Sequence, residues 1–330
     1  MIYREIGTTG MMASAIAFGA WAIGGGAWWG ETDDAESVNA LHAAIDNGIN
    51  FIDTAPVYGF GRSEEVVGNA ITGKRDKVIL ATKVGLWWND ERGAFFFTHQ
   101  DGPTVRRSLR PDTIAIEIED SLRRLKTDYI DLYQTHWQAI EPEKTAIEDT
   151  MASLVKLKDA GKIRAIGVSN CTPDQMDEYK KSGDISANQP RYSMLDRAIE
   201  DELVPYCIKN KISILAYSPL EQGLLTGKIT MDSTFAKGEN RNNLIWMKPV
   251  NRQKVINVLE SWEDLKNKYN CSTSQLVISW TINQPGITFA LCGARKVYQI
   301  EDNIKAADIK INEDDIKRMR YDLQTTCIAE

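Results

Sequence analysis

An acid and a phenol lie close together near the start of this sequence. The apolar residues before Asp53 predict a strand that ends at this carboxylate, and Tyr58 follows in a loop with a proline and two glycines. The two side chains could share one cleft and move a proton. The alternative is structural, with Asp53 bonded to loop amides and Tyr58 a half-buried aromatic. Ser63, followed by two acids, is expected to cap the next helix.

Other polar side chains also follow apolar runs. Lys83 ends the strand predicted at 78–82, and buried lysines are seldom without a partner. His136 follows the strand predicted at 129–134. If these strands are neighbours in one sheet, Lys83 lies beside Asp53. Positions at or just beyond other strand ends hold Ser169, Asn170, Gln189, Tyr217, Ser218 and Arg295.

A parallel sheet would bring these strand ends to one edge, and the chain has the pattern for one. Apolar strands alternate with amphipathic helices eight times, from the strand at 16–20 to the strand at 287–291. Eight units favour an α/β fold, a (β/α)8 TIM barrel with its site at the C-terminal strand ends. A β-hairpin at 2–15 is expected before the barrel and helices near 298–306 and 313–325 after it. Residues 1–330 are expected to form a single domain.

Three segments carry further structural predictions. The stretch 87–110 is expected to be a long loop, and 219–249 is expected to be irregular. Residues 252–268 are expected to form one helix.

Two glycine patterns imitate nucleotide-binding motifs. Gly24, Gly26 and Gly30 nearly match the dinucleotide signature, with Asp53 as the ribose-binding acid, but the spacing fails by one residue and the next helix starts too late. The stretch 68–74 resembles a P-loop, yet Arg75 replaces the required Ser or Thr. We therefore expect no Rossmann fold, and we expect 68–74 to be the end of a helix.

Composition narrows the class of protein. The 330 residues are 43% hydrophobic and carry a net charge of −7 without a basic block, which predicts a large core and argues against nucleic-acid binding. No leader and no run near the ~18 apolar residues of a membrane span are found, so we expect a cytoplasmic protein. Scattered cysteines and three histidines indicate reduced thiols and no metal site.

The chain resembles the aldo-keto reductase family along nearly its whole length. The resemblance rests on 48–55 with Tyr58 and Gly59, and on 81–83, 131–137, 161–170 and 293–296. The bacterial branch of general-stress and inositol-locus reductases is the most similar. The resemblance implies a barrel that binds NADP(H) without a Rossmann domain and reversibly reduces an aldehyde or ketone. We favour a sugar or polyol-related compound as its substrate.

By position, the resemblance assigns catalysis to Asp53, Tyr58, Lys83 and His136. Tyr58 would donate a proton to the carbonyl oxygen. A free phenol has a pKa near 10, and a nearby ammonium lowers it, which is the role implied for Lys83. Asp53 would orient Lys83, and His136 would position the carbonyl.

The resemblance also implies a cofactor site. Trp21, Asp53, Ser169, Asn170, Gln189 and Tyr217 would surround the nicotinamide. Ser218, Leu220, Gln222, Gly223, Lys228 and Arg241 would follow the pyrophosphate and ribose, and Gln299 and Asn303 would lie near the adenine end. Gly293 would also contact the cofactor. Arg295 would hold the 2′-phosphate, which favours NADPH over NADH. Ala20 and Cys171 depart from the residues common in the family.

Aromatic residues in the loops above the strand ends are the candidates for substrate contacts. They are Trp28, Trp29, Trp87, Trp88 and Trp137, with the phenylalanines at 95–97, and their rings could stack on a sugar or an aryl carbonyl. Arg106, Arg107 and Arg110 could form an anion site. Loop packing and surface charge are the alternatives. A second class of function also stays open, an NADP(H)-sensing regulatory module with little turnover, because potassium-channel β subunits resemble this family. The oligomeric state is not predicted.

Overall fold

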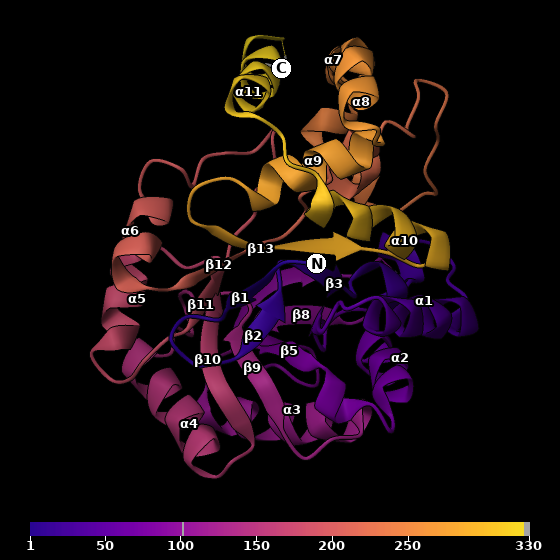
Figure 1. Cartoon of the computed structure of the whole chain (residues 1–330). Helices are drawn as coiled ribbons and strands as arrows, with labels where there is room; N and C mark the ends of the chain where they lie inside the picture. Colours follow the sequence, from indigo (N-terminus) through magenta and orange to yellow (C-terminus); the bar gives the residue numbers. More distant parts are fainter. Residues whose placement is uncertain (101, 327–330) are drawn as a thin grey trace.

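The computed structural model describes residues 1–100 and 102–326, and eight parallel strands close into a barrel (Figure 1). The strands, in chain order, are β3 (Ile16–Gly19), β4 (Phe51–Asp53), β5 (Ile79–Val84), β9 (Ile130–Thr135), β10 (Ile163–Ser169), β11 (Ala187–Gln189), β12 (Ser213–Ala216) and β13 (Ile287–Gly293). Pairing of β13 with β3 closes the sheet. The (β/α)8 TIM barrel is thereby confirmed.

Helices alternate with the barrel strands along the chain. They are α1 (Asp34–Asp46), α2 (Arg62–Ile71), α3 (Pro111–Leu125), α4 (Ile147–Asp159), α5 (Pro173–Lys180), α6 (Leu203–Asn210), α9 (Thr273–Ile282) and α10 (Val297–Lys305). Local signals set several helix starts: Thr172 and Gln175 form a reciprocal capping box at α5, as Ser272 and Gln275 do at α9. Three more helices, α7 (Pro249–Ser261), α8 (Glu263–Tyr269) and α11 (Glu313–Thr326), lie together at the top of Figure 1.

A hairpin closes the N-terminal end of the barrel. Strands β1 (Tyr3–Glu5) and β2 (Met12–Ser14) pair antiparallel and lie across the barrel in Figure 1. Ile6 and Met11 pack with Phe51 and Phe289 in the barrel interior, where the two phenyl rings are 5.1 Å apart. Burial of each large apolar side chain contributes about 1.5–3 kcal/mol. With this end filled, the opposite rim is the end available for a site.

The segment expected to be a long loop contains a small sheet. Strands β6 (Leu86–Trp87), β7 (Ala94–Thr98) and β8 (Thr104–Arg107) pair antiparallel in the order β6-β8-β7. Val105 is buried while its neighbour Arg106 is partly exposed, which is the alternation of a strand with one covered face. The strands are only two to five residues long, which leaves too short an alternating pattern for a strand to be predicted.

Two other predicted segments also differ. Residues 252–268 are divided into α7 and α8 at Trp262, whose φ of −89° and ψ of 18° lie outside the helical range. Its fully buried indole donates to Asp322 Oδ2 at 2.9 Å in α11. The segment 219–249 contains the 3₁₀ helices η4 (Glu221–Thr226), η5 (Asn240–Asn243) and η6 (Ile245–Met247).

Ser63 does not cap α2. The cap position is Gly61, with φ of 103°, and Ser63 Oγ instead donates to the Ala20 carbonyl at 2.8 Å and bonds Thr54 Oγ1 at 2.8 Å. This serine therefore ties α2 to the ends of β3 and β4.

Neither of the two glycine-containing stretches that resemble nucleotide-binding motifs folds as such a motif. The stretch 22–28 forms two short 3₁₀ helices, η1 (Ala22–Gly24) and η2 (Gly26–Trp28), and α1 starts only at Asp34. The stretch 68–74 contains the end of α2, as predicted. Neither supplies a glycine loop leading directly into a helix.

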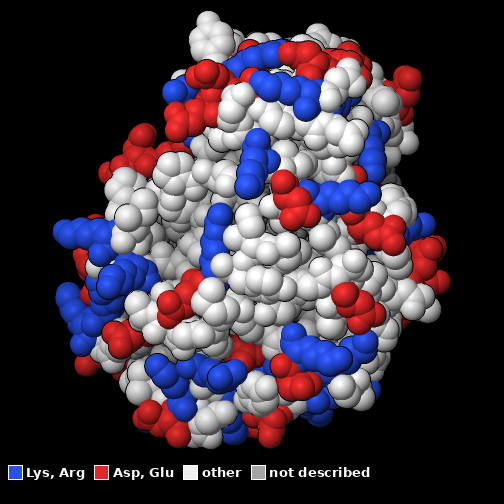
Figure 2. All heavy atoms as spheres, in the orientation of Figure 1, with Lys and Arg blue, Asp and Glu red and all other residues white. Residues whose placement is uncertain are grey.

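The surface carries mixed charge on the face that Figure 2 shows, where basic and acidic side chains are interspersed. Within the described residues, none of the helices combines the length and apolar character needed to cross a bilayer. Cys171, Cys207, Cys271 and Cys292 are free thiols, and Cys327 lies outside the described residues.

One buried acid predicts a pH-dependent stability. Glu117 of α3 accepts the Gly85 amide at 3.1 Å, and burial raises the pKa of Glu117 to about 8, against an ordinary value of 4.5. Because the folded state favours the protonated acid, its stabilising effect is present below the ordinary pKa and is lost as pH rises through about 8. We expect the free energy of unfolding of the wild type to fall relative to that of Glu117→Gln between these values. Urea denaturation at several pH values measures this difference.

The control is Glu119→Gln, at an exposed position of the same helix where Glu119 pairs with Lys162. That variant should follow the wild-type pH profile. Parallel profiles for Glu117→Gln and the wild type would contradict the prediction.

Candidate active site

The four residues assigned to catalysis meet at the C-terminal rim of the barrel. Lys83 Nζ donates to Asp53 Oδ1 at 2.6 Å and to the Tyr58 hydroxyl at 3.2 Å. The rings of Tyr58 and His136 are 5.7 Å apart and nearly perpendicular. Strands β4, β5 and β9 are neighbours in the barrel, which is why residues distant in sequence converge here.

Strand alternation aims these side chains into the barrel. In a strand, every second side chain points to the same face. Each polar residue comes two positions after a residue of the inner apolar cluster: Asp53 after Phe51, Lys83 after Ala81 and Gln134 after Leu132. The apolar layer below therefore supports a polar layer at the rim.

Lys83 is fully buried and its three ammonium hydrogens have three partners. In addition to Asp53 and Tyr58, its Nζ donates to the Thr54 carbonyl at 2.9 Å. Burial alone would lower the pKa of Lys83, but the charge of Asp53, with Tyr58, raises it above the ordinary value. Lys83 is consequently a fixed cation beside the phenol.

Two glutamines complete the bonding of the Asp53 carboxylate. Its Oδ2 accepts from Gln134 Nε2 at 3.0 Å and from Gln189 Nε2 at 2.9 Å. Sequence reasoning missed Gln134. A signal was present, because an uncharged polar residue closing the apolar strand at 129–134 sits level with Lys83, its partner in the β5–β9 register.

The pKa values of Tyr58 and His136 shift in opposite directions, which gives the two side chains different roles. Burial raises the pKa of Tyr58, and the Lys83 ammonium opposes this without overcoming it. The expected lowering of this pKa by Lys83 is therefore present but outweighed. Burial and the charge of Lys83 hold the pKa of His136 well below its ordinary value. At neutral pH the phenol carries its proton and the imidazole is neutral, so Tyr58 can act as the acid.

A cavity of about 700 Å³ opens from Tyr58 and His136. Every residue that the sequence assigned to the cofactor lines it: Trp21, Asp53, Ser169, Asn170, Gln189, Tyr217, Ser218, Leu220, Gln222, Gly223, Lys228, Arg241, Gly293, Arg295, Gln299 and Asn303. The residues lie at the ends of β3, β4, β10, β11, β12 and β13 or in the segments that follow them, with Gln299 and Asn303 on α10. One continuous cavity thus joins the reactive rim to a distant cluster of cations.

Hydroxyl and amide groups are fixed near the reactive rim. Ser169 Oγ donates to the Gln189 carbonyl at 2.7 Å, Asn170 Nδ2 donates to Ser169 Oγ at 3.1 Å, and the Tyr217 hydroxyl donates to Asn170 Oδ1 at 3.0 Å. Asn170 has a φ of 53°, a left-handed conformation that asparagine tolerates. These bonds present a planar ring and amide groups to the cavity, which suits a carboxamide-bearing ring.

Lys228, Arg241 and Arg295 line the cavity away from the rim. Arg241 pairs with Glu239 and lies 4.2 Å from the Phe235 ring. Arg295 Nη1 donates to the Trp29 carbonyl at 3.2 Å, and Arg295 forms no ion pair with another described residue. These cations at one end and the amide groups at the other fit the phosphates and the nicotinamide of a dinucleotide.

The same region includes residues that sequence reasoning missed. Asn240, Ser274 and Asp302 also line the cavity. Ser274 Oγ and Gln275 Nε2 donate to the Asp302 carboxylate at 2.5 and 2.7 Å. Helical spacing could have indicated Asp302, since it follows Gln299 by three residues on α10.

Aromatic and aliphatic side chains form the wall beside the reactive rim. Trp28 and Trp137 line the cavity as predicted, together with Leu86, Phe96 and Phe97. Trp29 also lines it, but its ring packs against Trp21 at 5.2 Å and its carbonyl bonds Arg295. Trp29 is thus placed toward the cations and not toward the rim.

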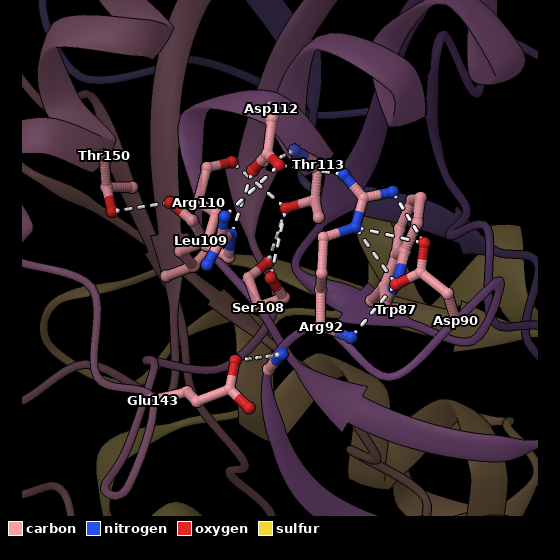
Figure 3. A network of polar contacts seen from close by, with 11 residues as sticks. Trp87, Asp90, Arg92, Ser108, Leu109, Arg110, Asp112, Thr113, Glu143 and Thr150 are labelled. Carbon is pink, nitrogen blue, oxygen red and sulfur yellow. Dashed lines mark hydrogen bonds and ion pairs between the residues drawn. The ribbon is translucent and has the colours of Figure 1, made fainter.

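Trp87 does not line the cavity, which corrects its prediction as a substrate contact. It is buried in β6, its Nε1 donates to Asp90 Oδ1 at 2.8 Å, and the Arg92 guanidinium covers its ring at 4.7 Å (Figure 3). Arg92 also pairs with Asp112 of α3 at 2.9 Å. The pairing of β6 with β8 turns this ring away from the rim, a fact that residue type could not reveal.

The fold and the site define a carbonyl-reducing oxidoreductase that uses a nicotinamide cofactor. The model of the aldo/keto reductase family matches residues 15–321, and the chain belongs to this family. It is 42% identical over 317 residues to the NADH-specific methylglyoxal reductase of Escherichia coli, with 96% of each chain covered.

Solved structures agree with this assignment. The glycerol dehydrogenase AKR11B4 from Gluconobacter oxydans has a TM-score of 0.88 and 38% identity, covering 98% of this chain and 95% of that one. An aldo/keto reductase from Klebsiella pneumoniae, in complex with NADP and acetate, has a TM-score of 0.69 and 28% identity, with 97% and 93% covered.

Proposed function

We propose that this protein reduces a small carbonyl compound related to a sugar or polyol, reversibly, with NADPH as its preferred electron donor and Tyr58 as the proton donor. The observation that carries the proposal is the contact of Lys83 Nζ with both the Tyr58 hydroxyl and Asp53, at the edge of the cavity. The same cavity contains the amide groups and cations that suit the two ends of the cofactor.

Each residue of the site has a separate role in the reaction. When bound, the nicotinamide supplies hydride to the carbonyl carbon. Tyr58 gives its phenolic proton to the carbonyl oxygen, and the Lys83 ammonium stabilises the phenolate that remains. Asp53 holds Lys83 in place and charged. His136, being neutral, positions the carbonyl through a hydrogen bond and does not compete with Tyr58 as the acid.

The names of the relatives support a small substrate. Methylglyoxal and glycerol are both short compounds that carry oxygen on adjacent carbons, and the relatives named for them align with nearly all of this chain. Initial rates of NADPH oxidation with methylglyoxal, glyceraldehyde and longer aldose sugars test the proposal. Turnover of none of these carbonyls would contradict it.

NADPH preference is a separate expectation, because the Escherichia coli relative is named NADH-specific. Arg295 supports NADPH, since its guanidinium lines the cavity without a carboxylate partner among the described residues. Arg295→Gln is expected to raise the KM for NADPH by about 10-fold, the effect of losing one charged hydrogen bond, and to leave the KM for NADH nearly unchanged. Steady-state kinetics with each cofactor measures both values.

The matched control is Lys296→Gln, which changes the adjacent cation that pairs with Glu36 at 3.5 Å. It should leave the ratio of the two KM values as in the wild type. Equal kcat/KM for NADPH and NADH in the wild type would reject the cofactor preference while leaving the carbonyl chemistry intact.

A further inference from the structure

Glu221 is a fully buried acid within a segment that otherwise lines the cavity. In the segment 217–223, every residue except Glu221 contributes to the cavity wall. The segment begins directly after β12 and continues into η4. Buried acids are seldom without a partner, because removing a charge from water is costly. The side chain of Glu221 is therefore directed to partners outside the cavity.

The backbone of segment 217–223 is strained. Ser218, Glu221 and Gln222 have φ angles of 57°, 45° and 52°, in the left-handed region that residues other than glycine rarely adopt. Two hydrogen bonds of 2.9 Å close successive turns, from Glu221 N to the Ser218 carbonyl and from Gly223 N to the Leu220 carbonyl. Such a backbone costs free energy and persists only where surrounding contacts hold it. The shape of this part of the cavity wall thus depends on what anchors the segment.

Two side chains outside the segment bind the Glu221 carboxylate. Its Oε2 accepts from Arg191 Nη2 and its Oε1 accepts from Ser193 Oγ, both at 2.5 Å. The Ser193 oxygen already accepts two backbone amides at 3.1 Å, so its own proton goes to Glu221. Burial raises the pKa of Glu221, and the charge of Arg191 opposes this rise. A cation and a hydroxyl therefore hold a charged carboxylate at the strained part of the segment.

The anchoring arginine belongs to a part of the chain that also supports the reactive rim. Arg191 lies two residues after Gln189, the last residue of β11, which bonds the Asp53 carboxylate. A parallel bridge joins Arg191 to Tyr217, and the Tyr217 amide donates to the carbonyl of the residue before Arg191 at 3.1 Å. The ion pair with Glu221 adds a second attachment four residues further along the segment. Both ends of the strained turns are thereby tied to β11.

Gln222 connects segment 217–223 to a second part of the cavity wall. Its Oε1 accepts from Asn240 Nδ2 at 3.0 Å. Asn240 begins η5, which also contains Arg241, and both residues line the cavity. A displacement of Gln222 would therefore reach one of the cations expected to hold the cofactor.

We propose that Glu221 is a positioning residue for the nicotinamide cofactor: together with Arg191, it fixes segment 217–223 in the conformation that receives the dinucleotide. The inference rests on the proposed function, which places the cofactor in this cavity. Without the anchor, the strained backbone relaxes, and only a fraction of the molecules present the binding conformation. The apparent Kd is then the intrinsic Kd divided by that fraction.

Glu221→Gln tests the anchor, because it removes the charge and keeps the shape of the side chain. We expect the Kd values for NADPH and NADH, measured by calorimetry, to rise about 10-fold, the effect of losing one charge-assisted hydrogen bond. Bound cofactor restores the conformation, so kcat at saturating cofactor should not fall. The Kd for adenosine 2′-monophosphate should stay near the wild-type value, since the residues expected at the adenine end lie outside segment 217–223.

The partner and a matched control complete the set of variants. Arg191→Met should weaken NADPH binding at least as much, because it leaves Glu221 buried without a cation. The double variant should resemble one single variant and not show the product of both effects, since the two residues act as a pair. Asp196→Asn removes the other carboxylate that pairs with Arg191, at 3.1 Å, and should leave the Kd near the wild-type value because Asp196 does not belong to the segment.

The outcomes are distinguishable. Weaker binding of the dinucleotides, with kcat and the binding of adenosine 2′-monophosphate unchanged, supports the proposal. A wild-type Kd in Glu221→Gln, a loss confined to kcat, or equal weakening of the dinucleotides and the monophosphate overturns it, while carbonyl reduction by the wild type leaves the proposed function standing. A wild type that binds neither dinucleotide and reduces no carbonyl contradicts the proposed function, and the role of Glu221 with it.

Discussion

Replacing Tyr58 with phenylalanine should lower kcat for carbonyl reduction by a factor of about 10²–10⁴, the usual contribution of a positioned general acid. The substitution removes only the hydroxyl that Lys83 contacts at 3.2 Å. The ring remains, with its packing against Trp21 and His136. Binding of NADPH, measured by calorimetry, should therefore change little while turnover is lost.

A conservative control shows that the loss is local. Tyr321→Phe removes a hydroxyl from a side chain that is 67% exposed on α11 and should leave kcat unchanged. Wild-type turnover by Tyr58→Phe would remove this phenol from the mechanism and leave the source of the proton to another group.

Lys83→Met should lose both activity and stability. The substitution leaves the Asp53 carboxylate buried without its cation, a change that costs about 3–5 kcal/mol in the free energy of unfolding. It also removes the charge that stabilises the phenolate of Tyr58 during proton transfer. Urea denaturation and steady-state kinetics on one preparation measure the two losses.

The double variant Lys83→Met with Asp53→Asn separates these effects. The neutral amide no longer requires a cation, and Gln134 and Gln189 already bond this side chain, so part of the lost stability should return. Turnover should not return, because the phenolate still lacks its stabilising charge. Recovery of activity in the double variant, or a single variant as stable as the wild type, would contradict the assigned role of the ion pair.

The barrel and the reactive rim could be predicted because both depend on local patterns. Strand alternation, helix periodicity and polar residues at strand ends are visible within short windows, and parallel strands bring their carboxyl ends to one rim. Asp53, Lys83 and His136 were found in this way. Gln134 is also a polar residue at a strand end, but its role depends on a hydrogen-bond acceptor, Asp53, that belongs to another strand.

Other features depend on contacts that no short window contains. The helix predicted at 252–268 is interrupted at Trp262, whose indole is fully buried and bonds Asp322 in another helix. Trp87 and Trp137 are alike in residue type and both follow strand-forming segments, yet one is covered by Arg92 and the other lines the cavity. The pairing of β6 with β8 turns Trp87 away from the cavity, whereas Trp137 lies just beyond the end of β9.

The sequence by itself determined the fold class, the set of groups able to move a proton and the cations suited to a cofactor, because residue type and spacing encode strand ends directly. Tertiary structure alone decided which aromatic rings reach the cavity and that burial outweighs Lys83 in the pKa of Tyr58. Those properties arise from desolvation and strand register, which are set by neighbours far away in the chain.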